Sequence, residues 1–178
     1  INGQGGAGSD TPATGEGIYS SLLPSSAELP AGWTIDNVSL GEGLSKVWDW
    51  SVYNGTGYAK ASAYVNNVAI ASESYLVSPE IDLTGVKGAS LTFEHAAKFQ
   101  TTLTKLCGVV IREAGATTWT ALTVPTWPTA GSWTFANSGK VDISAFDGKK
   151  VQIAFKYASS SEGADTWEVQ NLIIDGNK

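Results

Sequence analysis

Three residue types that often carry chemistry are scarce in this chain of 178 residues: methionine is absent, and cysteine and histidine occur once each. Because position 1 is not methionine, we expect a processed or truncated piece, with any signal peptide lying upstream of it. The single cysteine, Cys107, excludes an intrachain disulfide. No spacing links Cys107 to the single histidine, His95, so a Cys–His nucleophilic pair has little support.

Basic residues are also few, with 11 Lys and Arg against 17 Asp and Glu and a net charge of -6. Binding of nucleic acid or of an anionic membrane face requires a concentrated basic surface, and no basic run is present. The chain also lacks the apolar run of about 18 residues that a membrane span needs. We therefore expect no nucleic-acid partner and no membrane insertion by this segment.

The segment 1–17 is rich in glycine and almost free of apolar side chains. Such a segment cannot bury enough surface to offset the entropy of ordering, so we predict a flexible linker at 1–17. The remaining residues, 18–178, are enough for one domain with a sizeable core. Because flexible tethers join two parts of a protein, we expect an upstream domain or a lipid anchor.

Short strand patterns separated by turn residues fill the rest of the chain. The pattern in 150–158, followed by a polar loop and the pattern in 166–175, predicts that the chain closes on a β-hairpin. No apolar stripe of helical period persists over three turns, so we expect helix only as single turns, such as one near 144–147. The predicted strands are 46–52, 57–64, 74–78, 89–99, 106–113, 118–123, 132–136, 139–143, 149–158 and 166–175.

These patterns predict an all-β fold, a jelly-roll β-sandwich of two antiparallel sheets with little helix. Cys107 and His95 are both in phase with apolar strand residues, which favours a buried cysteine and a hydrogen-bonded core or edge histidine. Six side chains are expected in the core and from both sheets: Phe93, Val109, Ile111, Ile153, Phe155 and Trp167. Three tryptophans are expected to anchor that core: Trp33, Trp119 and Trp167.

Seven motifs in one order, over about residues 29–175, carry a resemblance to a known family. They are LPAGWT, VWDW, GYAKASAY, SYLVSPEIDLTG, LTFEHAAKF, SWTFANSGKVDISAF and VQIAFKYASSSEGADTWEVQNLII. This series resembles the choice-of-anchor J and cleaved-adhesin modules of Bacteroidota surface proteins. The resemblance implies a jelly roll akin to MAM and galactose-binding-like domains. It also implies adhesion or carbohydrate binding on a secreted or outer-membrane-anchored protein.

Some modules of that family bind calcium through acids on the first and last strands. In this chain the first-strand region reads GIYSSLL, and Gln170 stands where the last-strand acid would be. Calcium prefers six to eight oxygen ligands with several carboxylates among them. We therefore expect no cofactor and a missing or depleted calcium site. If calcium did bind, the fallback ligands would be Glu94, Asp165 and Glu168.

Aromatic side chains give the candidate ligand site. Trp48 and Trp50 share one strand face, and Trp127 lies between two prolines, so their flat rings could stack on sugars, with Tyr53 beside them. Asp49 and Asn54 could bind hydroxyls at the fringe. The alternative is that these tryptophans are packing residues. Whether Trp48, Trp50, Trp127 or Trp133 lines an open groove would discriminate the two interpretations.

A catalytic interpretation has less support. Glu162, Asp165 and Glu168 cluster near the final turn, and paired carboxylates about 5 to 10 Å apart can hydrolyse glycosides. A solvated acidic loop is commoner, and no second acidic cluster in a motif context faces this one. Catalytic carboxylates also need a cleft that raises one pKa. A β-sandwich glycoside hydrolase is therefore the least favoured function.

Two other functions stay open at this point. The first is a noncatalytic, extracellular or cell-surface binding module that recognises a glycan or a host or bacterial surface protein. The second is a structural spacer or protein-interaction domain without a small ligand. The sequence favours the first, since its aromatic content exceeds what a spacer needs.

Overall fold

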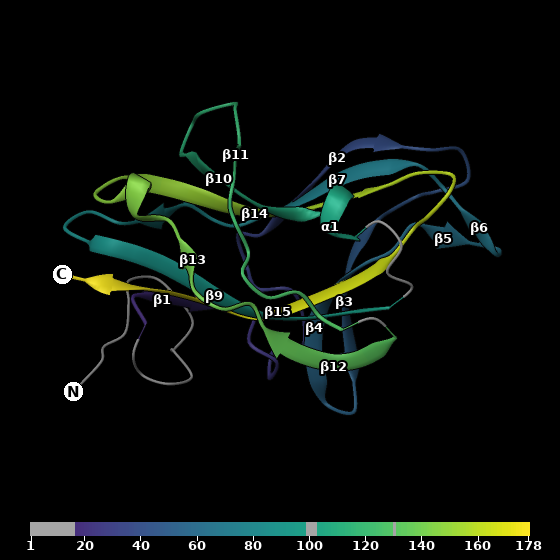
Figure 1. Cartoon of the computed structure of the whole chain (residues 1–178), viewed down its shortest axis with the longest axis horizontal. Helices are drawn as coiled ribbons and strands as arrows, with labels where there is room; N and C mark the ends of the chain where they lie inside the picture. The colour runs from purple at the N-terminus through teal and green to yellow at the C-terminus, as the bar shows by residue number, and fades with distance from the viewer. Residues whose placement is uncertain (1–16, 99–102, 130) are drawn as a thin grey trace.

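Two antiparallel sheets pack face to face in the computed structural model, which describes residues 17–98, 103–129 and 131–178 (Figure 1). The predicted linker at 1–17 lies outside these residues, except for Gly17. The larger sheet is 7-stranded and the smaller is 6-stranded. This is the jelly-roll β-sandwich that the strand pattern predicts.

The 7-stranded sheet has a main path of five strands with two short strands at its sides. In spatial order the path is β12 (Ser132–Asn137), β9 (Lys87–Lys98), β15 (Thr166–Asn177), β4 (Thr56–Ala61) and β3 (Trp48–Tyr53). The short strands are β1 (Tyr19–Ser21), which pairs with β15, and β13 (Val141–Asp142), which pairs with β9.

The 6-stranded sheet forms the other layer, in the upper half of Figure 1. Its path is β11 (Thr120–Ala121), β10 (Gly108–Glu113), β14 (Lys150–Ser159), β7 (Ser72–Val77) and β2 (Thr34–Leu40), with β8 (Ile81–Asp82) beside β14. A separate hairpin joins β5 (Tyr64–Val65) to β6 (Val68–Ala69). Helix in the described residues is confined to α1 (Leu103–Leu106) and η1 (Ser144–Phe146), and the latter confirms the single turn predicted near 144–147.

The predicted closing hairpin is wrong. β14 pairs with β10, β7 and β8, whereas β15 pairs with β9, β4 and β1 in the other sheet. The polar loop between them therefore crosses from one layer to the other. Phe155 and Trp167 face each other across the core, with ring centroids 5.9 Å apart in an edge contact. Both strands bury the face that carries these rings, and alternation alone does not say whether two such strands pair or oppose each other.

The core prediction is confirmed, because all six side chains are buried at 1% exposure or less. Cys107 is also buried, and burial raises the pKa of its thiol to about 12. Trp33 joins this core, where its Nε1–H donates to Ser21 Oγ at 3.0 Å. Trp119 does not: it lies on the outer face of the 6-stranded sheet, stacked on Tyr75 and covered by the Arg112 guanidinium.

His95 is a core residue with both ring nitrogens bonded. Trp167 Nε1–H donates to Nδ1 at 3.1 Å, so the ring proton belongs on Nε2, which lies 2.8 Å from the Thr126 carbonyl oxygen. Burial lowers the pKa of His95 to about 4, while the bond to Thr126 opposes that shift. The neutral ring thus ties β9, β15 and the loop before β12 together.

Truncating Phe155 tests the register of β14. Phe155→Ala should lower the free energy of unfolding by about 3 to 5 kcal/mol, because it leaves a cavity between the two sheets. Chemical denaturation would measure this loss. Val38→Ala, on an exposed position of the edge strand β2, is the control and should change stability by less than about 0.5 kcal/mol. A Phe155→Ala protein as stable as the control would contradict the register.

Candidate functional site

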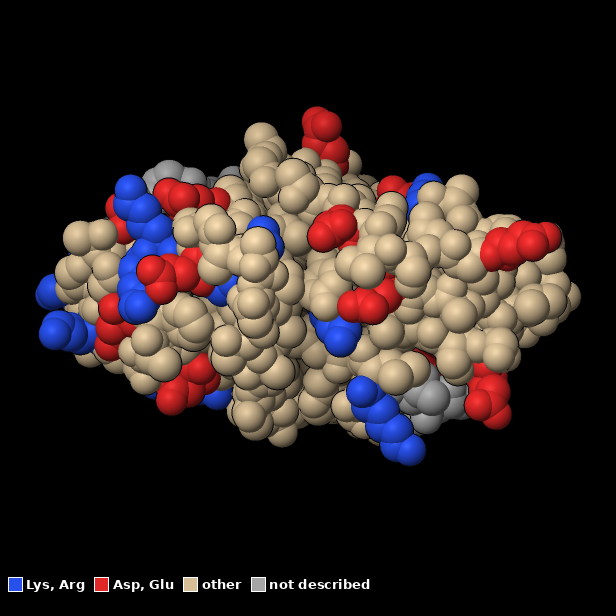
Figure 2. All heavy atoms as spheres, turned by 90° about the horizontal axis from the view of Figure 1, so that it is seen from above, with Lys and Arg blue, Asp and Glu red and all other residues tan. Residues whose placement is uncertain are grey.

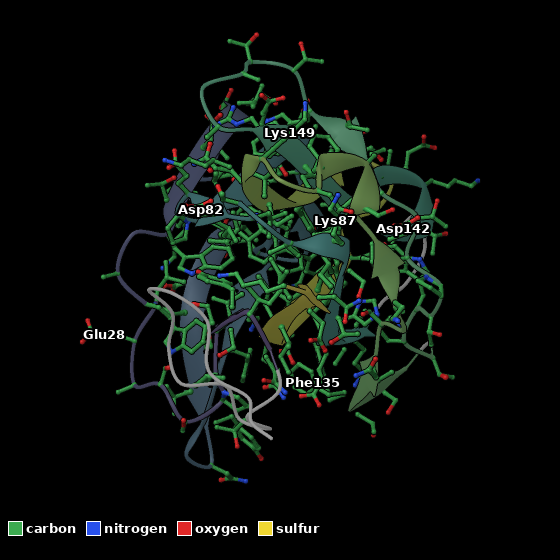
Figure 3. The ribbon with its side chains drawn as sticks, turned by 90° about the vertical axis from the view of Figure 1, so that its left-hand side faces the viewer. Glu28, Asp82, Lys87, Phe135, Asp142 and Lys149 are labelled. Atoms are coloured by element: carbon green, nitrogen blue, oxygen red, sulfur yellow. The ribbon has the colours of Figure 1, made fainter. Side chains whose placement is uncertain are left out.

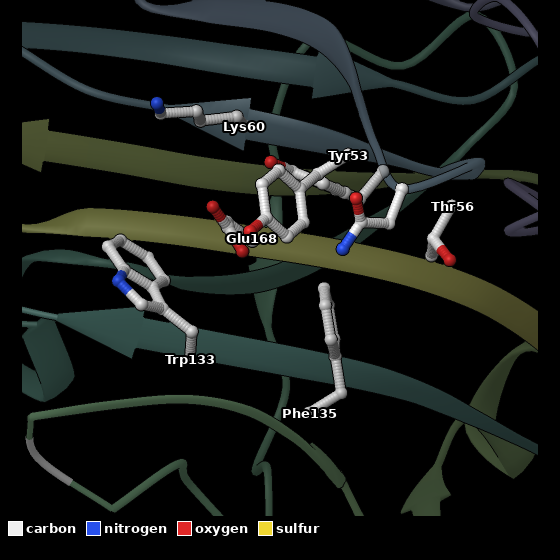
Figure 4. A pocket seen from close by; sticks show the side chains of 8 residues that line it. Tyr53, Thr56, Lys60, Trp133, Phe135 and Glu168 are labelled. Atoms are coloured by element: carbon white, nitrogen blue, oxygen red, sulfur yellow. The ribbon is translucent and has the colours of Figure 1, made fainter.

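A hollow of about 730 Å³ opens on the outer face of the 7-stranded sheet (Figure 4). It is called the aromatic groove below. Its lining comes from β3, β4, β12, β15 and the turn between β3 and β4. The lining residues are Tyr53, Asn54, Thr56, Tyr58, Lys60, Trp133, Phe135 and Glu168. Figure 3 places Phe135 low in the molecule, well away from Lys149 and Asp82 of the other layer.

Strand alternation decides which side chains reach the groove. On β4, Gly57, Ala59 and Ala61 are buried, and the three residues between and before them line the groove. On β15, Trp167 and Val169 are fully buried, so Glu168 between them points outward. The β3–β4 turn is built from Asn54 and Gly55, whose positive φ angles of 51 and 76° fit a tight hairpin.

The sheet is curled strongly at this place. Tyr58 on β4 and Phe135 on β12 have two other strands between them, β15 and β9. Strands lie about 4.8 Å apart, so these two backbones would be about 14 Å apart in a flat sheet. Their ring centroids nevertheless lie 6.0 Å apart. The two rings therefore meet above the concave face.

The groove carries accessible aromatic surface. Tyr53 is 69% exposed and Trp133 is 42% exposed. Figure 4 shows Tyr53 and Lys60 on one side, Trp133 and Phe135 on the other, and Glu168 between them. Lys98 lies 5.7 Å from the centre of the Trp133 ring, a cation–π distance that helps to hold the indole. Exposed rings on opposite walls can stack on a flat ligand.

Glu168 is the polar group at the centre of the aromatic groove. The residue is only 6% exposed, and burial raises the pKa of its carboxyl to about 7, against the lowering effect of Lys60. Lys60 lies directly opposite Glu168 on β4. Burial and the charge of Glu168 in turn raise the pKa of Tyr58. Near neutral pH the Glu168 carboxyl can thus accept a hydrogen bond, or donate one when protonated.

The three tryptophans predicted to stack on sugars do not line the aromatic groove. Trp48 is 2% exposed, and its Nε1–H donates to the Ser74 carbonyl oxygen inside the core, so it offers no surface to a ligand. Trp50 is half-buried against Gly57, where a Cβ would lie 2.7 Å from the indole. Trp127 is also half-buried, 5.3 Å from His95 and 5.7 Å from Trp167 by ring centroids. These three tryptophans pack against the core.

Other parts of the prediction do lie at the groove. Tyr53 and Asn54 line it. Of the four tryptophans whose exposure was to discriminate ligand binding from packing, Trp133 lines it. Sequence reasoning missed Tyr58 and Phe135. Strand alternation could have identified both residues. Tyr58 lies two positions from Lys60 on β4, and Phe135 lies two positions from Trp133 on β12, so each shares a strand face with another residue of the groove. What the sequence does not contain is the pairing that brings β12 and β4 to the same concave face.

The fallback metal ligands do not converge. Among residues 17–98, 103–129 and 131–178 no three His, Cys, Asp or Glu side chains form a group that could hold a metal. Glu94 accepts a hydrogen bond from Gln170 Nε2 at 2.9 Å, Asp165 lies in the loop before β15, and Glu168 faces the groove. The modules that the motifs resemble carry calcium acids on their first and last strands; at the corresponding positions of β1 and β15, Ser20, Ser21 and Gln170 offer only hydroxyl and amide oxygens. This set does not fit calcium, which prefers several carboxylates.

Charges of both signs are interspersed on the face that Figure 2 shows, which belongs to the 6-stranded sheet. No continuous basic area is present on that face. None of the helices in the described residues has the length and apolar composition needed to cross a bilayer. Of the acidic trio considered for hydrolysis, only Glu168 lines the aromatic groove.

Comparison with known proteins adds information on the fold. No family model matches the sequence, and no curated protein matches it significantly. The K1 cleaved adhesin domain of Lys-gingipain from Porphyromonas gingivalis W83 is similar, with a TM-score of 0.55 and 18% identity over 89% of this chain and 98% of that one. The K3 cleaved adhesin domain of the same protein gives 0.50 and 19% over 83% and 93%.

A third similar structure is that of TmCBM61 in complex with β-1,4-galactotriose. Its TM-score is 0.50 at 8% identity, over 83% of this chain and 90% of that one. Identities this low establish the fold alone. The chain therefore has the β-sandwich fold of these domains, in agreement with the fold that the sequence motifs imply.

The buried carboxyl of Glu168 makes a pH-dependent prediction. With a pKa raised from 4.5 to about 7, the folded state binds more protons than the unfolded state between these values. The contribution of Glu168 to stability is then present below pH 4.5 and is lost as the pH rises through about 7. Relative to wild type, Glu168→Gln should gain on the order of 2 kcal/mol in unfolding free energy across this range, allowing for solvent screening.

Urea denaturation at several pH values would measure that difference. Glu162→Gln removes one charge from the exposed loop before β15 and is the matched control. A pH-independent difference between Glu168→Gln and wild type would show that the carboxyl is not desolvated in the groove.

A second prediction concerns metal removal. It follows from Gln170, which stands where the resembling modules carry a calcium-binding acid. EDTA should shift the thermal midpoint very little, because a site that binds no metal adds nothing to the stability of the native state. Differential scanning calorimetry with EDTA and then with excess Ca²⁺ would test it. A large fall in the midpoint, reversed by Ca²⁺, would overturn the prediction and return Glu94, Asp165 and Glu168 to consideration.

Proposed function

We propose that this chain is a noncatalytic extracellular module of a bacterial surface protein and that it binds glycans in the aromatic groove. The observation that carries the proposal is the groove itself: exposed rings on two walls, with Glu168 and Lys60 between them. We also propose that the module belongs with the choice-of-anchor J and cleaved-adhesin modules, because of the sequence motifs quoted above. Secretion or anchoring at the outer membrane belongs to the same proposal.

The chemistry of the groove fits a carbohydrate. Sugar rings have an apolar C–H face that packs on flat side chains, and Trp133, Phe135, Tyr53 and Tyr58 provide such surface. Sugar hydroxyls both donate and accept hydrogen bonds. Glu168, Lys60 and Asn54 provide both kinds of partner. A mostly apolar hollow with a few convergent polar groups is typical of small-ligand sites.

The similar structures support the same class. One of them is a complex with β-1,4-galactotriose, and two are cleaved adhesin domains. The groove also argues against hydrolysis, because most glycosidases use two carboxyl groups at the scissile bond. Glu168 is the one carboxyl that lines the described groove.

Removing the exposed indole tests the proposal. Trp133→Ala should lower glycan affinity by about tenfold, because stacking is lost on one wall. Isothermal titration calorimetry would follow a screen of plant, mucin and bacterial glycans that includes β-1,4-galactan and cellulose. Circular dichroism and thermal melting should show an unchanged fold.

Thr134→Ala is the matched control, since Thr134 is the neighbouring exposed residue of β12 and does not line the groove. Equal affinities for the Trp133→Ala and Thr134→Ala proteins would exclude this groove as the site. Absence of binding to every glycan of the screen would favour the spacer or protein-interaction function instead.

A further inference from the structure

A second hollow of about 320 Å³ lies on the same outer face, toward the sheet edge at β3. It is called the polar hollow below. The loop before β3 forms one wall, and the β5–β6 hairpin forms part of another. Its side chains differ from those of the aromatic groove: Ser45, Ser51 and Ser62 supply hydroxyls, and Tyr64 supplies one aromatic ring, which is 54% exposed.

Lys60 lines both hollows, so they meet at this residue. The register explains why they are continuous. Tyr53 pairs with Thr56 and Ser51 with Tyr58, and Asp49 pairs with Lys60, so one face of the β3–β4 ladder runs from the aromatic groove into the polar hollow. At about 3.3 Å per residue, the stretch from Thr56 to Ser62 spans about 20 Å. That length exceeds what one sugar ring needs.

The charges at this junction are balanced. Lys60 faces Glu168 on β15 and Asp49 on β3. Lys46 is paired with Asp49 at 2.6 Å. The described lining thus holds two lysines and two carboxyl groups, and each lysine has a carboxyl group beside it, so neither is an isolated cation that would favour an acidic polymer. Hydroxyl-rich neutral chains suit it better, because they can bond to groups of either sign.

We propose that the aromatic groove and the polar hollow form one extended site for a neutral oligosaccharide, whose further units lie in the polar hollow. The proposal rests on the glycan-binding function above and adds the extent of the site and the charge class of the ligand. Stacking on Trp133 and its neighbours holds one end of the chain. Hydrogen bonds from Lys60 and Ser62, together with packing on Tyr64, hold the other end.

Chain length separates the two parts of the site. The probes are β-1,4-galacto-oligosaccharides and cello-oligosaccharides, each from the disaccharide to the hexasaccharide. Tyr64→Ala should lower the affinity for the hexasaccharide by about three- to tenfold and leave that for the disaccharide unchanged. Trp133→Ala should lower both. Val68→Ala is the control, because Val68 is a 56% exposed residue of the same hairpin that does not line the hollow.

A second readout does not depend on substitution. In NMR titrations of the wild-type protein, the hexasaccharide should shift the amide signals of Ser62 and Tyr64, whereas the disaccharide should shift only those around Trp133. An acidic series of oligogalacturonides should bind more weakly than the neutral chains of equal length.

Each contrary outcome has a distinct meaning. If Tyr64→Ala changes neither affinity, or both equally, the extended site is wrong while the effect of Trp133→Ala leaves the proposed function standing. Tighter binding of oligogalacturonides would overturn the neutral class. If wild-type protein binds neither neutral series, the extended site and glycan binding by these chains both fail.

Discussion

The contacts of Trp167 are the constraint on which the rest of the structure depends. Its ring lies against Phe155 of the opposite sheet, at 5.9 Å, and against Trp48 of its own sheet, at 6.0 Å. Its Nε1–H is bonded to His95. An indole with this many partners has one orientation. Because side chains alternate on a strand, fixing Trp167 inward fixes Glu168 outward, on the face that the aromatic groove occupies.

This coupling divides the aromatic residues into two groups. Trp48, Trp50, Trp127 and Trp167 join or cover the core, while Tyr53, Tyr58, Trp133 and Phe135 lie on the concave outer face. A shift of one residue in the register of β15 would place Glu168 in the core and expose Trp167. The free energy of a buried carboxylate makes such a shift unfavourable. The packing of the core therefore also specifies the groove.

The sequence predicts which side chains of a strand are buried better than it predicts which strands pair with each other. Alternation in 150–158 and 166–175 correctly buries Phe155 and Trp167, but it cannot show that the two strands lie in opposite sheets, since that depends on pairings far apart in the chain. The edge strand Thr34–Leu40 escaped prediction because its side chains are mostly exposed and carry no apolar period. The aromatic groove was not predicted for a related reason. The positions of tryptophans along the chain do not show which strands lie side by side, and the contact between Tyr58 and Phe135 depends on the curvature of the whole sheet.

Two groups with strongly shifted pKa values lie on opposite faces of the 7-stranded sheet, and their contributions to stability change with pH in opposite directions. His95, whose folded-state pKa is about 4, contributes stability that is lost as the pH falls from 6.5 toward that value. Glu168, whose folded-state pKa is about 7, contributes stability that is lost as the pH rises from 4.5. Between pH 4.5 and 6.5 the two effects offset each other, so the wild-type protein can look insensitive to pH while both groups are strongly perturbed. The pH-dependent contribution of Glu168 is thus measurable only as the difference in unfolding free energy between wild type and Glu168→Gln. Both proteins contain His95, so the contribution of the histidine cancels in that difference.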